Sequence, residues 1–145
     1  EKHMKLDKPI NQYTLPELLS IVRNALNLSY NNIHLTGSRY YGTNKSDADY
    51  DFIIYEPLSF KEFQQKYFDL GFEPCSDEYA LDQSKYFIVR DANNINLIVT
   101  NNPEKYEKRI SATTLCKLYK LPKDNVVAIH NALLQEGLYD NSIPF

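Results

Sequence analysis

Residues 35–55 contain the side chains whose types and spacing could do chemistry. Gly37 and Ser38 follow a short apolar run, and Asp49 and Asp51 stand two residues apart where a second apolar run begins. A glycine lets backbone amides approach phosphate oxygens, and a serine hydroxyl can add a hydrogen bond. Side chains two apart on a strand share a face, so both carboxylates could hold Mg²⁺ or Mn²⁺. The segment predicts a phosphate and metal site.

Arg39 and Gly42 are further candidates for nucleotide binding. Arg39 stands on the helical turn expected after Ser38 and could contact phosphate, although a solvent-facing arginine is an almost equal alternative. Gly42 is expected to end that turn, because glycine tolerates the backbone that stops a helix. Tyr40 and Tyr41 could stack a base, but at least one of them is expected in the core.

The pattern resembles the nucleotidyltransferase superfamily of DNA polymerase β. In that family a glycine follows the serine by four residues, as Gly42 follows Ser38, and six residues separate this glycine from an Asp-x-Asp pair. The variant Gly-Ser-Arg-Tyr-Tyr-Gly-Thr-Asn is similar to small nucleotidyltransferase-like proteins encoded by bacteriophages. The resemblance implies that Gly37, Ser38, Arg39 and Gly42 bind a nucleoside triphosphate and that Asp49 and Asp51 hold the catalytic metal.

Asp47 offers an alternative alignment of the acidic residues. The Ser-Asp-x-Asp motif that is frequent in the family would select Ser46, Asp47 and Asp49 instead. We prefer Asp49 and Asp51, because an apolar strand follows Asp51 directly and would hold that pair at a rigid strand edge.

Asn96 stands where active members of the family commonly supply a third carboxylate from a later strand. An amide can ligate a cation weakly but cannot take a proton at neutral pH. Transfer is therefore impaired or another acid substitutes. Glu78, Asp82 and Asp91 are the possible substitutes, although each is typical of a surface carboxylate.

The elements expected to position these residues indicate an α/β or α+β fold, a minimal nucleotidyltransferase fold with a small mixed sheet of about four strands. We predict a helix over 15–28, strands at 33–36 and 49–55, a capped helix from Ser59 to Gly71, and a hairpin of 86–89 and 95–99. Residues 73–83 are polar and irregular. Pro103 is expected to open one helix of a C-terminal pair, and Pro122 to precede the other.

The 145 residues suffice for one hydrophobic core and are too few for two ordinary domains. We expect one domain over residues 4–145, with residues 1–3 a cloning remnant and residues 102–145 forming the C-terminal helices. Cys75 and Cys116 match no disulfide framework or zinc-ligand spacing, which favours a cytoplasmic setting, the host cytoplasm if the protein is phage-encoded. No apolar run approaches the roughly 18 residues that span a membrane.

The net charge of −3 gives no general attraction for nucleic acid, and nothing indicates DNA. A local basic run is interpreted as a solvated helix face: Lys105, Lys108, Arg109, Lys117, Lys120 and Lys123. His34 and His130 are interpreted as structural.

Three functional hypotheses remain open at this point. The first is metal-dependent transfer of a nucleoside monophosphate from an NTP to a hydroxyl of protein, RNA or a small molecule. The second is a catalytically silent domain that binds nucleotide, RNA or a host protein, which Asn96 favours. The third is one half of a two-protein toxin and antitoxin system that modifies its partner's tyrosine.

Overall fold

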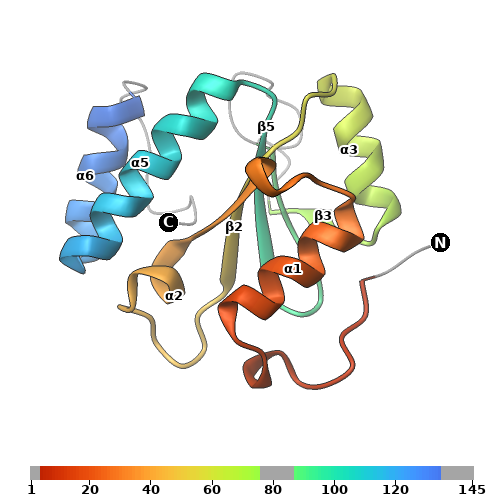
Figure 1. The fold of residues 1–145 in the computed structure, drawn as a ribbon, viewed down its shortest axis with the longest axis horizontal. Helices are drawn as coiled ribbons and strands as arrows, with labels where there is room; N and C mark the ends of the chain where they lie inside the picture. Colours follow the sequence, from red (N-terminus) through yellow and green to blue (C-terminus); the bar gives the residue numbers. More distant parts are fainter. Residues whose placement is uncertain (1–3, 76–86, 135–145) are drawn as a thin grey trace.

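The computed structural model describes residues 4–75 and 87–134 and has a mixed α/β fold (Figure 1). Five strands form one sheet in the order β1-β2-β5-β4-β3, with β2 and β5 parallel and the other neighbouring pairs antiparallel. The strands are β1 (Ile33–Thr36), β2 (Tyr50–Tyr55), β3 (Glu73–Pro74), β4 (Phe87–Arg90) and β5 (Ile95–Thr100).

The prediction of about four strands missed β3. Glu73 and Pro74 pair with Arg90 and Val89 of β4, although their sequence has no strand periodicity. An edge strand of two residues carries too short a pattern to be recognised locally. The remainder of the segment predicted to be irregular, from residue 76, lies outside the described residues.

The helices begin and end largely where capping residues predict. They are α1 (Leu15–Leu26), α2 (Gly37–Tyr41), α3 (Phe60–Asp69), α5 (Pro103–Tyr119) and α6 (Lys123–Leu134), with 3₁₀ turns η1 (Ile10–Gln12) and η2 (Tyr30–Asn32). Thr14 before α1 and Ser59 before α3 each form a capping box with the glutamate three residues later. The first helix ends two residues before the predicted boundary, because Asn27 takes a left-handed backbone with φ 54°.

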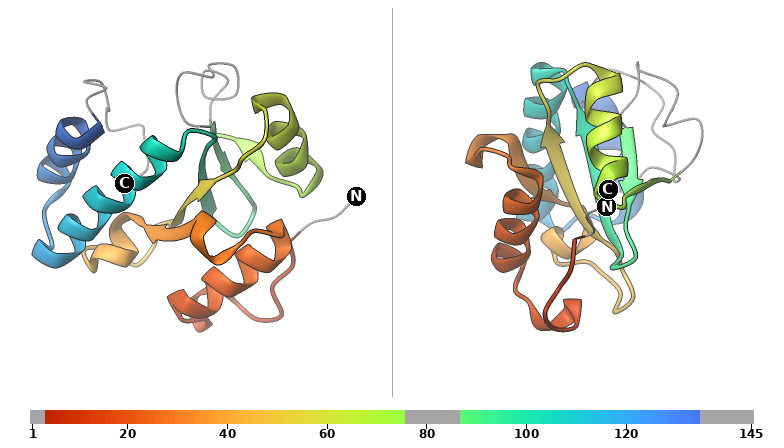
Figure 2. Two further views of the ribbon diagram at one scale, coloured as in Figure 1. Left: turned by 45° about the horizontal axis from the view of Figure 1, so that its top comes forward. Right: turned by 90° about the vertical axis from the view of Figure 1, so that its right-hand side faces the viewer.

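Helices cover both faces of the sheet. Figure 1 shows α1 and α3 on one side of β2 and β5, and α5 and α6 on the other. Figure 2 shows from two further directions that α2 lies beside α5. Alternation along β2 explains the layering, since Phe52 and Ile54 enter the core cluster under α1 and α3, whereas Ile53 enters the cluster under α5.

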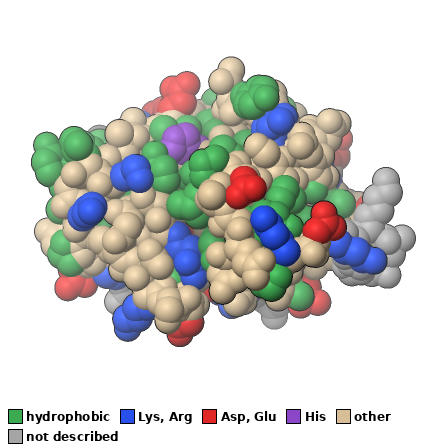
Figure 3. Space-filling model, turned by 60° about the horizontal axis from the view of Figure 1, so that its bottom comes forward, with side chains coloured by type: hydrophobic (Ala, Val, Ile, Leu, Met, Phe, Trp, Pro, Cys, Tyr) green, Lys and Arg blue, Asp and Glu red, His purple; other side chains and the backbone are tan. Residues whose placement is uncertain are grey.

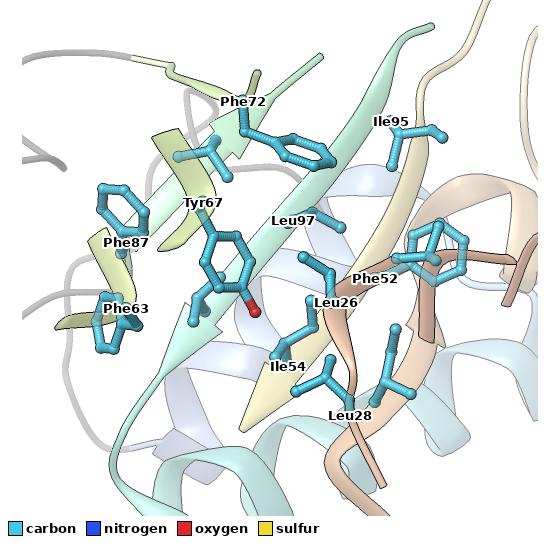
Figure 4. Packing of buried hydrophobic residues seen from close by; sticks show 14 of the residues in the cluster. Leu26, Leu28, Phe52, Ile54, Phe63, Tyr67, Phe72, Phe87, Ile95 and Leu97 are labelled. Atoms are coloured by element: carbon cyan, nitrogen blue, oxygen red, sulfur yellow. The ribbon is translucent and has the colours of Figure 1, made fainter. Parts of the chain in front are cut away.

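The larger core is rich in aromatic rings. Figure 4 shows Phe63 and Tyr67 of α3 pointing toward the sheet beside Phe87 of β4, and the ring centroids of Phe63 and Phe87 lie 5.4 Å apart. Leu26 and Leu28 cover the neighbouring part of β2. This packing holds β2, β5 and β4 rigidly on one face and leaves their other face to position polar side chains near one end.

The C-terminal helical pair is confirmed as far as residue 134, and residues 135–145 of that prediction lie outside the described residues. One part of the basic run was misinterpreted. Lys117, Lys120 and Lys123 are exposed, whereas Arg109 is fully buried. Arg109 shares the inward face of α5 with Tyr106, Thr113 and Cys116, which follow helical spacing. Within residues 4–75 and 87–134, no helix has both the length and the apolar character needed to cross a membrane.

Candidate functional site

A row of polar residues crosses four strands near one end of the sheet. Thr36 of β1 is opposite Asp51 of β2, Asp51 is opposite Asn96 of β5, and Asn96 is opposite Arg90 of β4. Residues directly opposite each other on neighbouring strands point to the same face. We call Thr36, Asp51, Asn96 and Arg90 the polar row; it lies on the face covered by α2 and α5.

Asn96 joins the two predicted metal ligands. Its Nδ2 atom donates to Asp49 Oδ2 at 3.1 Å and to Asp51 Oδ1 at 2.9 Å. Asn96 therefore faces both carboxylates. Without a cation, the two amide hydrogens offset the repulsion that would otherwise separate the carboxylates.

Arg90 completes the arrangement and was not predicted. Its Nη2 atom lies 3.1 Å from Asp49 Oδ2, and its Nε donates to Asn96 Oδ1 at 2.8 Å. The side chains of Arg90 and Asp49 are 48% and 31% exposed. Arg90 ends an apolar strand six residues before Asn96, so the hairpin was visible in the sequence. The register of the hairpin, which the sequence does not show, places Arg90 opposite Asn96.

Asp51 is buried at the centre of the polar row, with 8% of its surface exposed. The pKa of the Asp51 carboxyl is raised to about 6 by several contributions together: burial, the largest, raises it, the Asn96 hydrogen bond lowers it, and the charge of Asp49 raises it. The charges of Arg109 and Lys123 lower it. A carboxyl with this pKa can exchange a proton near neutral pH, which an ordinary surface aspartate does much less readily.

Gly37 is required by the position of Asp51. Its backbone φ is +82°, and a Cβ added there would lie 2.0 Å from Asp51 Oδ2. The sequence suggested that this glycine admits a phosphate, and the structure adds that it admits the aspartate carboxylate. Ser38 follows in α2, is half-buried, and accepts at its backbone oxygen from the N–H groups of Gly42 and Thr43.

Gly42 ends α2 as predicted, with a left-handed φ of 84°. Arg39 binds the protein itself: its Nε donates to Ala48 O at 2.9 Å and its Nη2 to Ser46 O at 3.0 Å. The guanidinium also lies 3.9 Å from the centre of the Tyr50 ring. Arg39 therefore fixes the loop that leads into Asp49.

Thr36 connects the polar row to α2 and α5 through hydrogen bonds. Its Oγ1 atom lies 2.8 Å from Thr113 Oγ1 of α5 and 3.2 Å from the Tyr41 hydroxyl of α2. Tyr41 is in the core, as expected for at least one of the two tyrosines. His130 is buried and bonds Val126 O, and burial lowers its pKa to about 3, which keeps it neutral in keeping with a structural role.

None of the described candidate acids replaces the missing third carboxylate. Asp91 accepts from the N–H groups of Asn93 and Ile95 at 2.9 and 3.0 Å, so it fixes the β4–β5 turn. Asp47 is exposed in the loop before Asp49. Glu78 and Asp82 lie outside the described residues.

The donor set fits one hard divalent cation. Two carboxylates are the ligands that Mg²⁺ and Mn²⁺ prefer, and the Asn96 amide can present its oxygen after a half-turn. Residues 4–75 and 87–134 contain no group of three or more His, Cys, Asp or Glu side chains that could hold a metal. The carboxylates also do not form an open acidic cleft, because Asp51 is buried and Arg90 pairs with Asp49. Figure 3 shows acidic side chains only scattered over the surface seen from this end.

A groove of about 470 Å³ adjoins the polar row at the β3 and β4 edge. Its described lining is Gly71, Glu73, Pro74, Cys75, Arg90, Asp91 and Ala92. The volume falls in the range of small-ligand sites. Arg90 is thus shared between this groove and the carboxylate pair.

Comparison with protein-family models, with curated proteins and with solved structures found no match for this chain. Function is therefore inferred from the chemistry of Asp49, Gly37, Ser38 and the polar row.

Proposed function

We propose that the chain is a metal-dependent nucleotidyltransferase of the DNA polymerase β type. It would move a nucleoside monophosphate from an NTP to a hydroxyl of protein, RNA or a small molecule. The observation that carries the proposal is the packing of the Asp51 carboxylate against Gly37, with Asp49 joined to Asp51 through Asn96. A Gly-Ser turn and a carboxylate pair at one sheet end are what phosphate and metal binding together require.

Each residue of the site has a distinct part in this proposal. Ser38 and the amides near Gly37 bind phosphate oxygens, and Asp49 and Asp51 hold Mg²⁺ or Mn²⁺. A bound cation would offset phosphate charge and orient the attacking hydroxyl. Arg39 keeps the loop before Asp49 in place through the carbonyls of Ala48 and Ser46.

The acceptor hydroxyl must lose its proton while its oxygen bonds to the α-phosphorus and pyrophosphate leaves. Asn96 cannot take that proton. A cation at Asp49 and Asp51 would lower the pKa of the acceptor hydroxyl, so that its proton can pass to water.

A catalytically silent domain that binds nucleotide, RNA or a host protein is the second candidate. Two contacts favour it: Asn96 donates to both carboxylates, and Arg90 neutralises Asp49. Both reduce the negative charge available for cations. A domain of this kind would bind a nucleotide with one cation and release no pyrophosphate.

Incubation with each labelled NTP and Mg²⁺ or Mn²⁺ separates the two candidates. The matched variants are Asp49→Asn with Asp51→Asn, and Asp69→Asn, at an exposed position at the end of α3, as the control for the same chemical change. Pyrophosphate release or label on protein or RNA that is lost only in the double variant supports the enzyme. Calorimetric NTP binding that depends on the pair, without release, supports the silent domain. Unaltered NTP affinity in the double variant would refute a nucleotide-metal site.

A further inference from the structure

Arg90 occupies the oxygens that a cation at Asp49 and Asp51 would need. Arg90 Nη2 and Asn96 Nδ2 each lie 3.1 Å from the same atom, Asp49 Oδ2. Asn96 Nδ2 also donates to Asp51 Oδ1 at 2.9 Å. A divalent cation between the carboxylates would meet donor hydrogens on both sides and would be repelled by the guanidinium.

We propose that Arg90 is an exchangeable counter-ion, which holds Asp49 in the free protein and moves to a phosphate of the nucleotide when a cation binds. This inference rests on the proposed function, because it assigns a phosphate-binding residue to the same site. It predicts that the cation and the nucleotide bind weakly alone and strengthen each other.

The position of Arg90 permits the exchange. Its backbone is fixed in β4 between Asn96 of β5 and Glu73 of β3, whereas its side chain is 48% exposed and lines the 470 Å³ groove. The guanidinium can therefore leave Asp49 without unfolding a strand. Its planar fork of donors matches phosphate oxygens better than an ammonium does.

Asn96 couples the two events. To ligate a cation, its amide must turn so that Oδ1 replaces Nδ2 toward the carboxylates. The same turn removes the acceptor of Arg90 Nε, which now lies 2.8 Å from Asn96 Oδ1. Cation binding thus breaks both contacts that hold Arg90, and the phosphate offers replacement acceptors.

The test is Arg90→Gln, measured by calorimetry with Mn²⁺ alone and then with Mn²⁺ and the α,β-methylene analogues of ATP and GTP. Two opposite changes are expected. Mn²⁺ alone should bind about three- to tenfold more tightly, because a competing half-exposed ion pair is gone. The analogue should bind about tenfold more weakly or worse, because a charge-assisted phosphate contact is lost.

Two further variants control for charge and folding. Lys108→Gln removes a positive charge that pairs with Glu104 at 2.8 Å, one turn away on α5, and should change neither affinity. Arg90→Lys keeps the charge and loses the planar fork, so it should keep most of the Mn²⁺ competition and lose part of the analogue affinity. It also provides the measurement if Arg90→Gln does not fold.

Unchanged Mn²⁺ affinity in Arg90→Gln overturns the exchange, and so does unchanged analogue affinity in the presence of Mn²⁺. If the wild type binds no analogue at all, the proposed function fails and the phosphate step fails with it. A wild type that binds analogue but transfers nothing leaves the exchange intact and selects the silent domain.

Discussion

Gly37→Ala tests whether Asp51 and the Gly-Ser turn depend on each other. Gly37 has a φ of +82°, and a Cβ there would meet Asp51 Oδ2 at 2.0 Å and Asp51 Cβ at 2.8 Å. Gly42 is a matched control with a φ of +84°, because a Cβ there meets only Lys120 Cε at 3.9 Å. Both substitutions impose the same backbone strain, and only one of them displaces the carboxylate.

The expected magnitudes follow from these distances. An alanine forced into the left-handed region costs about 1 to 2 kcal/mol, which is the whole effect predicted for Gly42→Ala. At Gly37 the overlap with Asp51 adds about 1 to 3 kcal/mol, because a buried carboxylate must shift within a packed face. Gly37→Ala should therefore lower the free energy of unfolding by roughly 2 to 5 kcal/mol.

Urea denaturation followed by tyrosine fluorescence or circular dichroism measures the difference, with Asp51→Ala and the Gly37→Ala/Asp51→Ala pair completing a double-mutant cycle. Removal of the carboxylate should recover part of the Gly37→Ala loss, because Oδ2 is the nearest clashing atom. If Gly37→Ala is no more destabilising than Gly42→Ala, or if the cycle shows no coupling, the contact between Gly37 and Asp51 does not constrain the site.

Three further predictions concern the same site. Because burial raises the pKa of Asp51 to about 6, the folded chain keeps a proton that the unfolded chain releases. The stabilisation is present below the unfolded pKa and is lost as pH rises through 6. Between about pH 4 and pH 7 the free energy of unfolding of the wild type should fall by about 2 to 3 kcal/mol relative to that of Asp51→Asn, measured by denaturant titration. Parallel pH curves for the two proteins would contradict this. Asn96→Asp removes the donor to both carboxylates and adds a third charge, so its melting temperature should fall in EDTA and recover with Mg²⁺; equal melting in both would show that no cation binds there. Arg39→Met should cost about 1 to 2 kcal/mol of stability through the lost carbonyl bonds, with Lys61→Met on α3 as control, whereas unchanged stability with lost NTP affinity would assign Arg39 to phosphate instead.

Much of the fold was predictable because its signals act over three or four residues. Thr14 and Ser59 cap α1 and α3 through glutamates one turn away. Gly42 ends α2, and the alternation of β5 places Asn96 on the face opposite Leu97. Each of these features depends on local backbone geometry, so the sequence reports it directly.

Contacts between distant segments were not predictable in the same way. Arg109 looked like a member of a solvated basic face, but it is buried because α5 packs against β2 and α2. The strand β3 exists through its pairing with β4, and its two residues show no pattern of their own. Burial and edge pairing depend on which elements meet, and propensity does not encode that choice.

The candidate site also has local features that the sequence predicts and long-range contacts that it does not. The sequence alone predicted Gly37, Ser38, Asp49 and Asp51 as one site, since their spacing brackets one turn between two strands. The structure brings Asp51 against Gly37 and joins Asp49 to Asp51 through Asn96. Only the tertiary structure decided how charge is balanced there, because strand register brings Arg90 to Asp49 and Asn96 between the two carboxylates. Charge balance is set by distances of about 3 Å across strands, and those distances exist only once the sheet has formed.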